Sequence, residues 1–275
     1  MEGAPFDSQP VPYFKRISPL DLVETSRNTV GFVQSDGTQW SVEELVAMEF
    51  AYIKQLAENV AGEKVIDVVV TVPPYFSQFE RDAIVDSIEI AGLKTLALIN
   101  DGTAVAVNYA LTRTFSNPEY HIIYDAGASG IRATVASFAT ANDPKSGVAE
   151  TRINIAGVGY DRSIGGTELD RRLRDILVNS FNAKHKKDIR GDKRGMAKLW
   201  KEAQRVKAIL SANSETVSHV ESLAWDIDFK TRVTRVEFEA ECEDLEDKFA
   251  KPILDALQNA GLTLVILPSY FVFVI

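Results

Sequence analysis

One stretch constrains the fold more than any other, because it joins two strand patterns through a turn that carries almost no side chains. The apolar run Ile122–Tyr124 leads to Asp125, and residues 126–130 then read Ala-Gly-Ala-Ser-Gly. A second β-rich run, Thr134–Phe138, follows directly. Two such runs around a short turn predict a β-hairpin over residues 121–139.

The turn of this hairpin has the properties of an anion site. Residues with small side chains let backbone N–H groups approach a ligand, and such groups in a tight turn suit a phosphate. A neighbouring carboxylate, here Asp125, suits a hydrated magnesium ion or the orientation of an attacking water. A plain structural hairpin explains the same residues, because small residues are common in turns. Both interpretations stay open on this stretch alone.

Composition narrows the class of protein. The 275 residues, 45% hydrophobic and 25% charged, have ordinary globular composition and suffice for one large domain or two modest ones. A formal net charge of -9 argues against a general nucleic-acid binder, which needs a basic face. Cys242 is the single cysteine, which excludes an internal disulfide. A lone cysteine fits a reducing compartment without excluding an oxidising one, and we expect Cys242 to be a small buried or half-buried residue.

The two ends of the chain carry no targeting or membrane pattern. The first ten residues are polar and Pro-rich, without the basic start and apolar core of a signal peptide. The apolar C-terminal tract is too short to span a bilayer and contains Pro268. We therefore expect no membrane span, and no helix or turn in the tail over residues 263–275.

The first half predicts an α/β arrangement. Ser41 and Glu44 form a capping box for a helix that Gly62 ends. The β-branched run Val65–Val72 and the run Leu96–Ile99 predict buried parallel strands, joined by a helix in a right-handed βαβ unit. Residues 1–28 carry few periodic signals, so we expect this segment to be an irregular lead-in. A short strand over Val30–Val33 would follow it.

The second half predicts a strand meander followed by helices. A polar connection over residues 112–120 suggests a domain boundary before the hairpin. The further predicted elements are a third strand at 151–156, a Gly-rich segment at 157–166, a helix capped by Thr167 and Asp170, a helix at 192–210, strands at 217–223 and 227–236, and a helix at 237–260 disturbed at Pro252.

A series of short motifs follows the order known from one family. They are residues 68–76, Ile90–Leu93, Ile99–Ala104, the Asp125 hairpin, Gly165-Gly166, residues 185–189 and Lys207–Ser211. Over roughly residues 40–262 the chain resembles the nucleotide-binding domain of the heat-shock 70-kDa chaperone superfamily. At two of these motifs, Asp101-Gly102 and the turn after Asp125, the residues resemble those of the family's large endoplasmic-reticulum branch, the hypoxia up-regulated (170-kDa glucose-regulated) type.

This resemblance implies an α/β actin-like ATPase fold of the ribonuclease-H-like kind, with two lobes around a nucleotide cleft. Residues 1–114 would be part of lobe I with an irregular lead-in, residues 115–262 most of lobe II, and residues 263–275 an aberrant apolar tail. The first hairpin of lobe I has no counterpart in residues 1–40, and the second adenine loop is not found after Gly261. The resemblance therefore implies an incomplete domain, a fragment of a longer protein.

The resemblance also implies a site for ATP or ADP with Mg²⁺. Asp125 would hold the magnesium ion through water and orient the attacking water, and Asp101 would support the same water network. The implied nucleotide contacts are backbone N–H groups of Gly127, Ala128, Ser129 and Gly130, the turn Gly165-Gly166, and the ribose and adenine contacts Gln204, Lys207 and Ser211. Plain alternatives are a helix N-cap for Asp101, a solvated lysine for Lys207 and a loop serine for Ser211.

Several residues depart from the family pattern. Ala128 and Ser129 replace glycines, and Ala208 replaces the arginine that stacks on adenine. Arg132 stands where ordinary members have a second acidic residue. We therefore expect weak or no ATP hydrolysis, so that the chain is an ATPase by family resemblance only.

The implied function is that of a chaperone fragment. The parent protein would assist the folding of unfolded polypeptides with ATP in the endoplasmic reticulum lumen and act as nucleotide-exchange partner of a shorter heat-shock-type chaperone. The chain expressed as given, without a signal segment, would stay cytoplasmic. The alternatives are a non-catalytic interaction module that docks the shorter chaperone through the basic helix at 192–210, and a sugar or acetate kinase of the same fold, for which we find no catalytic base.

Overall fold

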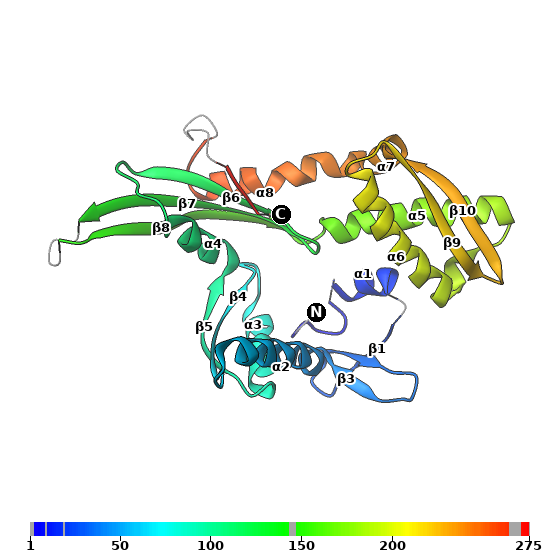
Figure 1. The fold of residues 1–275 in the computed structure, drawn as a ribbon, viewed down its shortest axis with the longest axis horizontal. Coiled ribbons are helices and arrows are strands. Elements are labelled where there is room, and N and C mark those ends of the chain that lie inside the picture. The colour runs from blue at the N-terminus through cyan, green and yellow to red at the C-terminus, as the bar shows by residue number, and fades with distance from the viewer. Residues whose placement is uncertain (1–2, 9, 19, 143–146, 264–270, 275) are drawn as a thin grey trace. The chain divides into compact units, whose positions relative to one another are not determined.

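The computed structural model describes residues 3–8, 10–18, 20–142, 147–263 and 271–274. The chain divides into two compact units, Met1–Ala104 and Val105–Ile275. Both units combine helices with strands, which confirms the predicted α/β class (Figure 1). The lobe boundary between residues 114 and 115 stays a prediction.

The N-terminal segment forms regular structure, and the irregular lead-in predicted over residues 1–28 is wrong. A helix and an antiparallel sheet occupy residues 10–41: α1 Pro10–Ile17, β1 Asp21–Glu24, β2 Val30–Val33 and β3 Gln39–Ser41. Val11 of α1 is buried in one cluster with Val30. Proline is favoured at the first position of a helix, where its missing N–H has no intrahelical partner, so Pro10 begins a helix.

The longest helix of the first unit begins and ends where the sequence predicts. In α2 Val42–Ala61, the Ser41 hydroxyl accepts from the Glu44 N–H, and the Glu44 side chain accepts from the Ser41 N–H. Gly62 ends the helix with φ 72°, a conformation that favours glycine. Both capping signals are local in sequence, which is why they were predictable.

The βαβ unit is confirmed in its pairing. β4 Asp67–Val72 pairs in parallel with β5 Lys94–Asn100, and α3 Gln78–Ile90 connects them. A second capping box, between Ser77 and Glu80, begins α3. Parallel neighbours require such a crossover connection.

The predicted burial of these two strands is wrong, because α3 covers one face only. Val72 is buried in a cluster with Ile88 of α3, and Val68 and Val70 pack against the same cluster. Val69 points to the other face and is 54% exposed. An unbroken apolar run does not reveal which face of a strand is covered.

The second unit is built on an antiparallel meander, which confirms the predicted hairpin and third strand. The strands of this sheet, in spatial order β11-β6-β7-β8, are β11 Phe271–Val274, β6 Glu119–Ala126, β7 Ile131–Asn142 and β8 Ala149–Asp161. β11 pairs in parallel with β6 and lies in the apolar tail, where the sequence predicts neither a helix nor a turn. Residues 264–270 of the predicted tail lie outside the described residues.

Helices cover both faces of this sheet (Figure 1). α4 Asp101–Ala110 packs through Ala106 against Ile123, whereas α8 Glu246–Asn259 packs through Ala256 against Ile122. Neighbouring residues of a strand point to opposite faces, so Ile122 contacts the helix on one face of the sheet and Ile123 the helix on the other.

α8 lies so close to β8 that two positions accept only glycine. A Cβ on Gly157 would lie 2.2 Å from the carbonyl oxygen of Ala256, and one on Gly159 would lie 2.1 Å from that of Pro252. The strand continues through both glycines to Asp161, whereas the sequence predicts only a Gly-rich segment there. Glycine inside a strand often marks such a close backbone approach.

The helix predicted over residues 237–260 is two helices. α7 Arg235–Glu241 ends before the 3-10 helix η2 Glu243–Leu245, after which α8 begins. Leu245 is buried with Ile131 of the meander, which explains the break at this point. α8 runs through Pro252, so this proline does not end the helix, and the disturbance predicted there stays a prediction.

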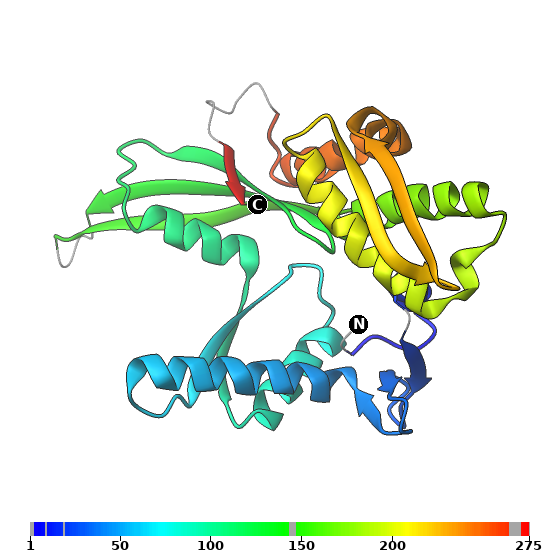
Figure 2. The same cartoon turned by 45° about the vertical axis from the view of Figure 1, so that its right-hand side comes forward.

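The remaining part of the second unit joins two helices to a hairpin (Figure 2). Its elements are α5 Gly166–His185, α6 Lys193–Leu210, β9 Glu215–Ala224 and β10 Ile227–Thr234. The apolar face predicted on the helix at 192–210 is confirmed, because Leu199, Ala203 and Val206 are buried in one core with Phe181 and Phe229.

Candidate functional site

The predicted phosphate turn is a four-residue loop between β6 and β7. The two strands stay paired as far as Ala126 and Ile131. The loop then closes on itself, because the Gly127 N–H donates to the Gly130 carbonyl oxygen at 3.1 Å. The two residues at its tip are exposed: Ala128 and Ser129.

The start of α5 lies directly against this loop. The Gly166 N–H donates to the Gly127 carbonyl oxygen at 3.0 Å, and the Thr167 N–H donates to the Ala128 carbonyl oxygen at 2.9 Å. The predicted cap formed by Thr167 and Asp170 is therefore wrong, since carbonyls of the turn satisfy the N–H groups at this helix end. We call the two segments, residues 127–130 and 165–166, the docked turns.

Gly165 makes the docking possible. A Cβ at this position would lie 2.6 Å from the Ala128 carbonyl oxygen and 2.7 Å from the Gly127 carbonyl oxygen. Carbon atoms do not approach carbonyl oxygens so closely, so only glycine fits. The structure thereby brings together two segments, far apart in sequence, that the sequence assigns separately to phosphate.

Lys207, in the last turn of α6, reaches the same place. Its Nζ donates to the Gly166 carbonyl oxygen at 3.0 Å and lies 2.7 Å from Oδ1 of the buried Asp170. The lysine therefore contacts the docked turns and is not simply solvated. Asp170, which the sequence places in a cap, is its ion-pair partner.

The other two predicted nucleotide contacts of α6 lie along the same helix face as Lys207. Gln204 is three residues before it and Ser211 four residues after it, the spacing of neighbours on a helix surface. Both are exposed, and the Ser211 hydroxyl donates to the Ala208 carbonyl oxygen at 2.7 Å. Their roles toward ribose and adenine stay predictions.

Asp101 belongs to the first compact unit, whereas the docked turns belong to the second. It is the first residue of α4, and its Oδ1 accepts from the Gly102 N–H at 2.7 Å. The plain alternative of a helix N-cap stays a prediction, since an N-cap side chain accepts from the second or third N–H of the helix and this bond comes from the next residue. Its share in a water network with Asp125 stays a prediction.

An ion pair at the mouth of the hairpin was not predicted. Arg132 stands opposite Asp125 in the strand register, and its Nη2 binds the Asp125 Oδ2. Both side chains are partly sheltered, with exposed fractions of 19% for Arg132 and 25% for Asp125. Counting outward from a turn over residues 127–130 would have placed the two opposite each other, so the signal was present in the sequence.

The carboxylates at the docked turns do not fit a magnesium ion held through Asp125. A magnesium ion needs only one or two protein carboxylates, since it keeps several waters. The Asp125 carboxylate is bound by the guanidinium of Arg132, and that of Asp170 by the ammonium of Lys207.

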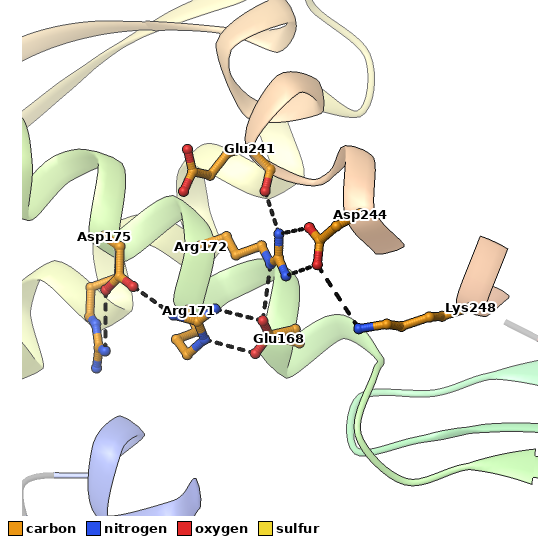
Figure 3. A network of polar contacts seen from close by, with 8 residues as sticks. Glu168, Arg171, Arg172, Asp175, Glu241, Asp244 and Lys248 are labelled. Carbon is orange, nitrogen blue, oxygen red and sulfur yellow. Dashed lines mark hydrogen bonds and ion pairs between the residues drawn. The ribbon is translucent and has the colours of Figure 1, made fainter. Parts of the chain in front are cut away.

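A network of charged side chains holds the first turn of α5 in place (Figure 3). The Glu168 carboxylate accepts from Arg171 at 2.8 and 2.6 Å and from Arg172 at 3.0 Å. Burial alone would raise the pKa of Glu168, but the hydrogen bonds and charges of the two arginines outweigh it and lower that pKa. Arg172 also binds Asp244 of η2 and the Glu241 carbonyl oxygen. The docked turns are thereby tied to the connection between α7 and α8.

Comparison with known proteins gives consistent matches. A family model described as Hsp70 protein matches residues 1–266, so the start of the resemblance predicted near residue 40 is wrong. Hypoxia up-regulated protein 1 of Danio rerio is 45% identical over 246 residues, which cover 88% of this chain and 25% of that protein. Heat shock protein 70 homolog lhs1 of Schizosaccharomyces pombe is 43% identical over 249 residues, covering 89% and 29%. The chain therefore spans only about a quarter of the length of these relatives.

Proposed function

Because the chain belongs to the Hsp70 family, we propose that it forms the part of an ATP-binding domain that contacts the phosphates and the ribose of the nucleotide. Its helices and strands fit the α/β actin-like ATPase fold of that family, and we propose that residues 1–114 belong to one lobe and residues 115–262 to the other. The exposed tip of the turn at residues 127–130 would face the phosphates of ATP or ADP, and Gln204, Lys207 and Ser211 would face the nucleoside.

One observation supports this proposal above the others. The turn at residues 127–130, the turn at Gly165-Gly166 and the ammonium of Lys207 are joined by hydrogen bonds of 2.9 to 3.0 Å. Three segments that the resemblance assigns to one ligand thus lie at one place. A hairpin serving only as structure does not require a lysine from a distant helix to bind the helix start that docks on its turn.

We propose that hydrolysis at this site is weak or absent. The carboxylate that would orient an attacking water, Asp125, is already bound by the guanidinium of Arg132, which competes with that water for the carboxylate oxygens. Ala128 and Ser129 add side chains where the backbone would approach a phosphate. Bound nucleotide would therefore act mainly as a ligand of this site and not as a rapidly consumed substrate.

Calorimetric titration of the 275-residue chain with ATP and with ADP tests the proposal. We expect saturable binding weaker than micromolar, and a loss of tenfold or more in Lys207→Met. Lys201→Met is the matched control, since Lys201 is exposed on the same helix, and we expect no change from it. Gln204→Ala removes an exposed side chain and should weaken binding without lowering the melting temperature. A folded chain that shows no saturable heat with either nucleotide refutes the proposal.

For the whole protein we propose the activity of a large chaperone of the hypoxia up-regulated type. It would assist unfolded polypeptides with ATP in the endoplasmic reticulum lumen and promote nucleotide exchange on a shorter heat-shock-type chaperone. No helix in the described part of the chain is long and apolar enough to cross a membrane. Faster release of labelled ADP from the shorter chaperone, on adding the whole protein, is the expected result; an unchanged release rate would count against the exchange role.

A second candidate is a non-catalytic module that docks the shorter chaperone. The observation that favours it is the row of basic side chains on α6, of which Arg194 and Lys201 are exposed. A pull-down with a shorter family member discriminates between the candidates. Binding that persists in Lys207→Met and is lost in Lys201→Glu supports the docking module, whereas no capture at micromolar concentration excludes it.

A further inference from the structure

The ion pair between Asp125 and Arg132 is built into the hairpin. The two residues are direct partners in the β6–β7 register, one pair before the turn. Directly opposite residues of an antiparallel pair point to the same face and stand close together. The register therefore places the two side chains beside each other on one face of the hairpin.

The guanidinium lies at the turn as well as on the carboxylate. Nη2 of Arg132 is 3.3 Å from the point where a Cβ on Gly127 would stand, and Oδ1 of Asp125 is 3.6 Å from the same point. A phosphate held by the N–H groups of the exposed tip would thus meet a positive charge beside it. Arginine suits this task, because its planar fork of N–H donors matches both carboxylate and phosphate oxygens.

The same arrangement disfavours a divalent cation. Asp125 is the residue that would hold magnesium, and its charge is already balanced by Arg132. A metal ion placed there would stand next to a guanidinium of like charge and would have to displace it. The second carboxylate at the docked turns, Asp170, is balanced by Lys207 in the same way.

We propose that Arg132 takes the place of the magnesium ion at this turn, so that the chain binds the phosphates of ATP or ADP without a divalent cation. The proposal rests on the proposed nucleotide binding at the docked turns. In it, Asp125 is the ion-pair partner of the guanidinium and not a metal ligand.

Titration with ATP in excess Mg²⁺ and in EDTA tests this directly. We expect the dissociation constants of the unaltered chain under the two conditions to agree within about twofold. Arg132→Ala should weaken binding in EDTA by tenfold or more and make it recover when Mg²⁺ is added. Arg152→Ala is the control, since Arg152 is an exposed arginine of β8 in the same sheet, paired with Ala139 far from the turn.

Asp125→Asn gives an outcome of opposite sign for the two mechanisms. If Arg132 holds the phosphates, removing the negative charge beside them should raise the affinity for ATP in EDTA several-fold. If Asp125 holds magnesium, the same substitution should lower the affinity for ATP in Mg²⁺, a condition in which the first mechanism predicts no loss.

The possible failures can be told apart. Binding by the unaltered chain that drops tenfold or more in EDTA overturns the role of Arg132 and leaves the proposed function intact. Unchanged binding of Arg132→Ala in EDTA has the same meaning. Absence of binding under every condition, from protein whose circular dichroism shows it folded, overturns both the proposed function and this inference.

Discussion

Replacing Gly165 by alanine should separate the docked turns. The added Cβ would stand 2.6 Å from the Ala128 carbonyl oxygen and 2.7 Å from the Gly127 carbonyl oxygen. Neither neighbour is the flexible end of a side chain, so the backbone itself has to move. The two hydrogen bonds that join the turns, from the N–H groups of Gly166 and Thr167, lie in the path of that movement.

The size of the effect follows from these contacts. Forcing one extra carbon into a packed site typically destabilises a protein by about 1–3 kcal/mol. Each backbone hydrogen bond that is lost adds about 1 kcal/mol. Since movement relieves the clash while it breaks the bonds, we expect Gly165→Ala to lower the free energy of unfolding by about 2–4 kcal/mol.

Urea unfolding followed by circular dichroism measures the total, and amide hydrogen exchange measures the local effect. The Gly166 and Thr167 amides should exchange faster in Gly165→Ala than in the unaltered chain. Gly191→Ala is the control, because a Cβ there would meet no atom within 4 Å and its φ is not in the left-handed region. That control should stay within about 0.5 kcal/mol of the unaltered chain.

The reasoning is refuted if Gly165→Ala unfolds at the same urea concentration as the control and the two amides keep their protection. Such a result would mean that the close approach of the turns is not required by the packing of the second unit. Faster exchange at Gly166 and Thr167 with unchanged global stability would place the effect in the site alone.

Three further predictions concern stability and reactivity. Glu168→Gln should lower the free energy of unfolding by about 1–3 kcal/mol, since it weakens hydrogen bonds to two arginines. Because the pKa of Glu168 is lowered in the folded state, its stabilisation is full above the unfolded pKa and is lost as pH falls through the folded value, so an acid titration of stability should be flatter in the variant. Burial raises the pKa of Cys242 to about 11, so iodoacetamide at pH 8 should label it slowly in the native chain and quickly in urea; equal rates would contradict the burial. Ser77→Ala removes a capping box and should lower the unfolding free energy by about 1 kcal/mol, with the exposed Ser214→Ala unchanged, as thermal melts would show.

Local signals in the sequence were enough for part of the fold. The capping boxes at Ser41 and Ser77 and the hairpin around Asp125 were predictable, because each depends on residues within a few positions of one another. α1 was missed, since three prolines in the first twelve residues indicate irregular chain and only one of them marks the helix start.

The contacts that make the site were harder to predict, because they join distant segments. Asp170 fits a cap with Thr167 when α5 is assumed to begin later, and nothing near it in sequence indicates Lys207 as its partner. The docking of Gly166 on Gly127 likewise depends on how α5 meets the meander. Arg132 is the exception, since its place opposite Asp125 follows from the length of the turn alone.

The two glycines of β8 matter during synthesis, because the helix that packs against them is translated long after the strand. The groove that Gly157 and Gly159 leave on the sheet is filled by α8, whose contacting residues begin at Pro252. A ribosome adding about 5–20 residues per second completes the strand several seconds, up to about 20, before that helix emerges. During this interval the apolar side of the meander, with Ile122 and Val135, lacks its cover. Nascent chains stalled before residue 252 should therefore be cut by protease within the meander. Longer chains, in which α8 has left the exit tunnel as far as Asn259, should resist the protease.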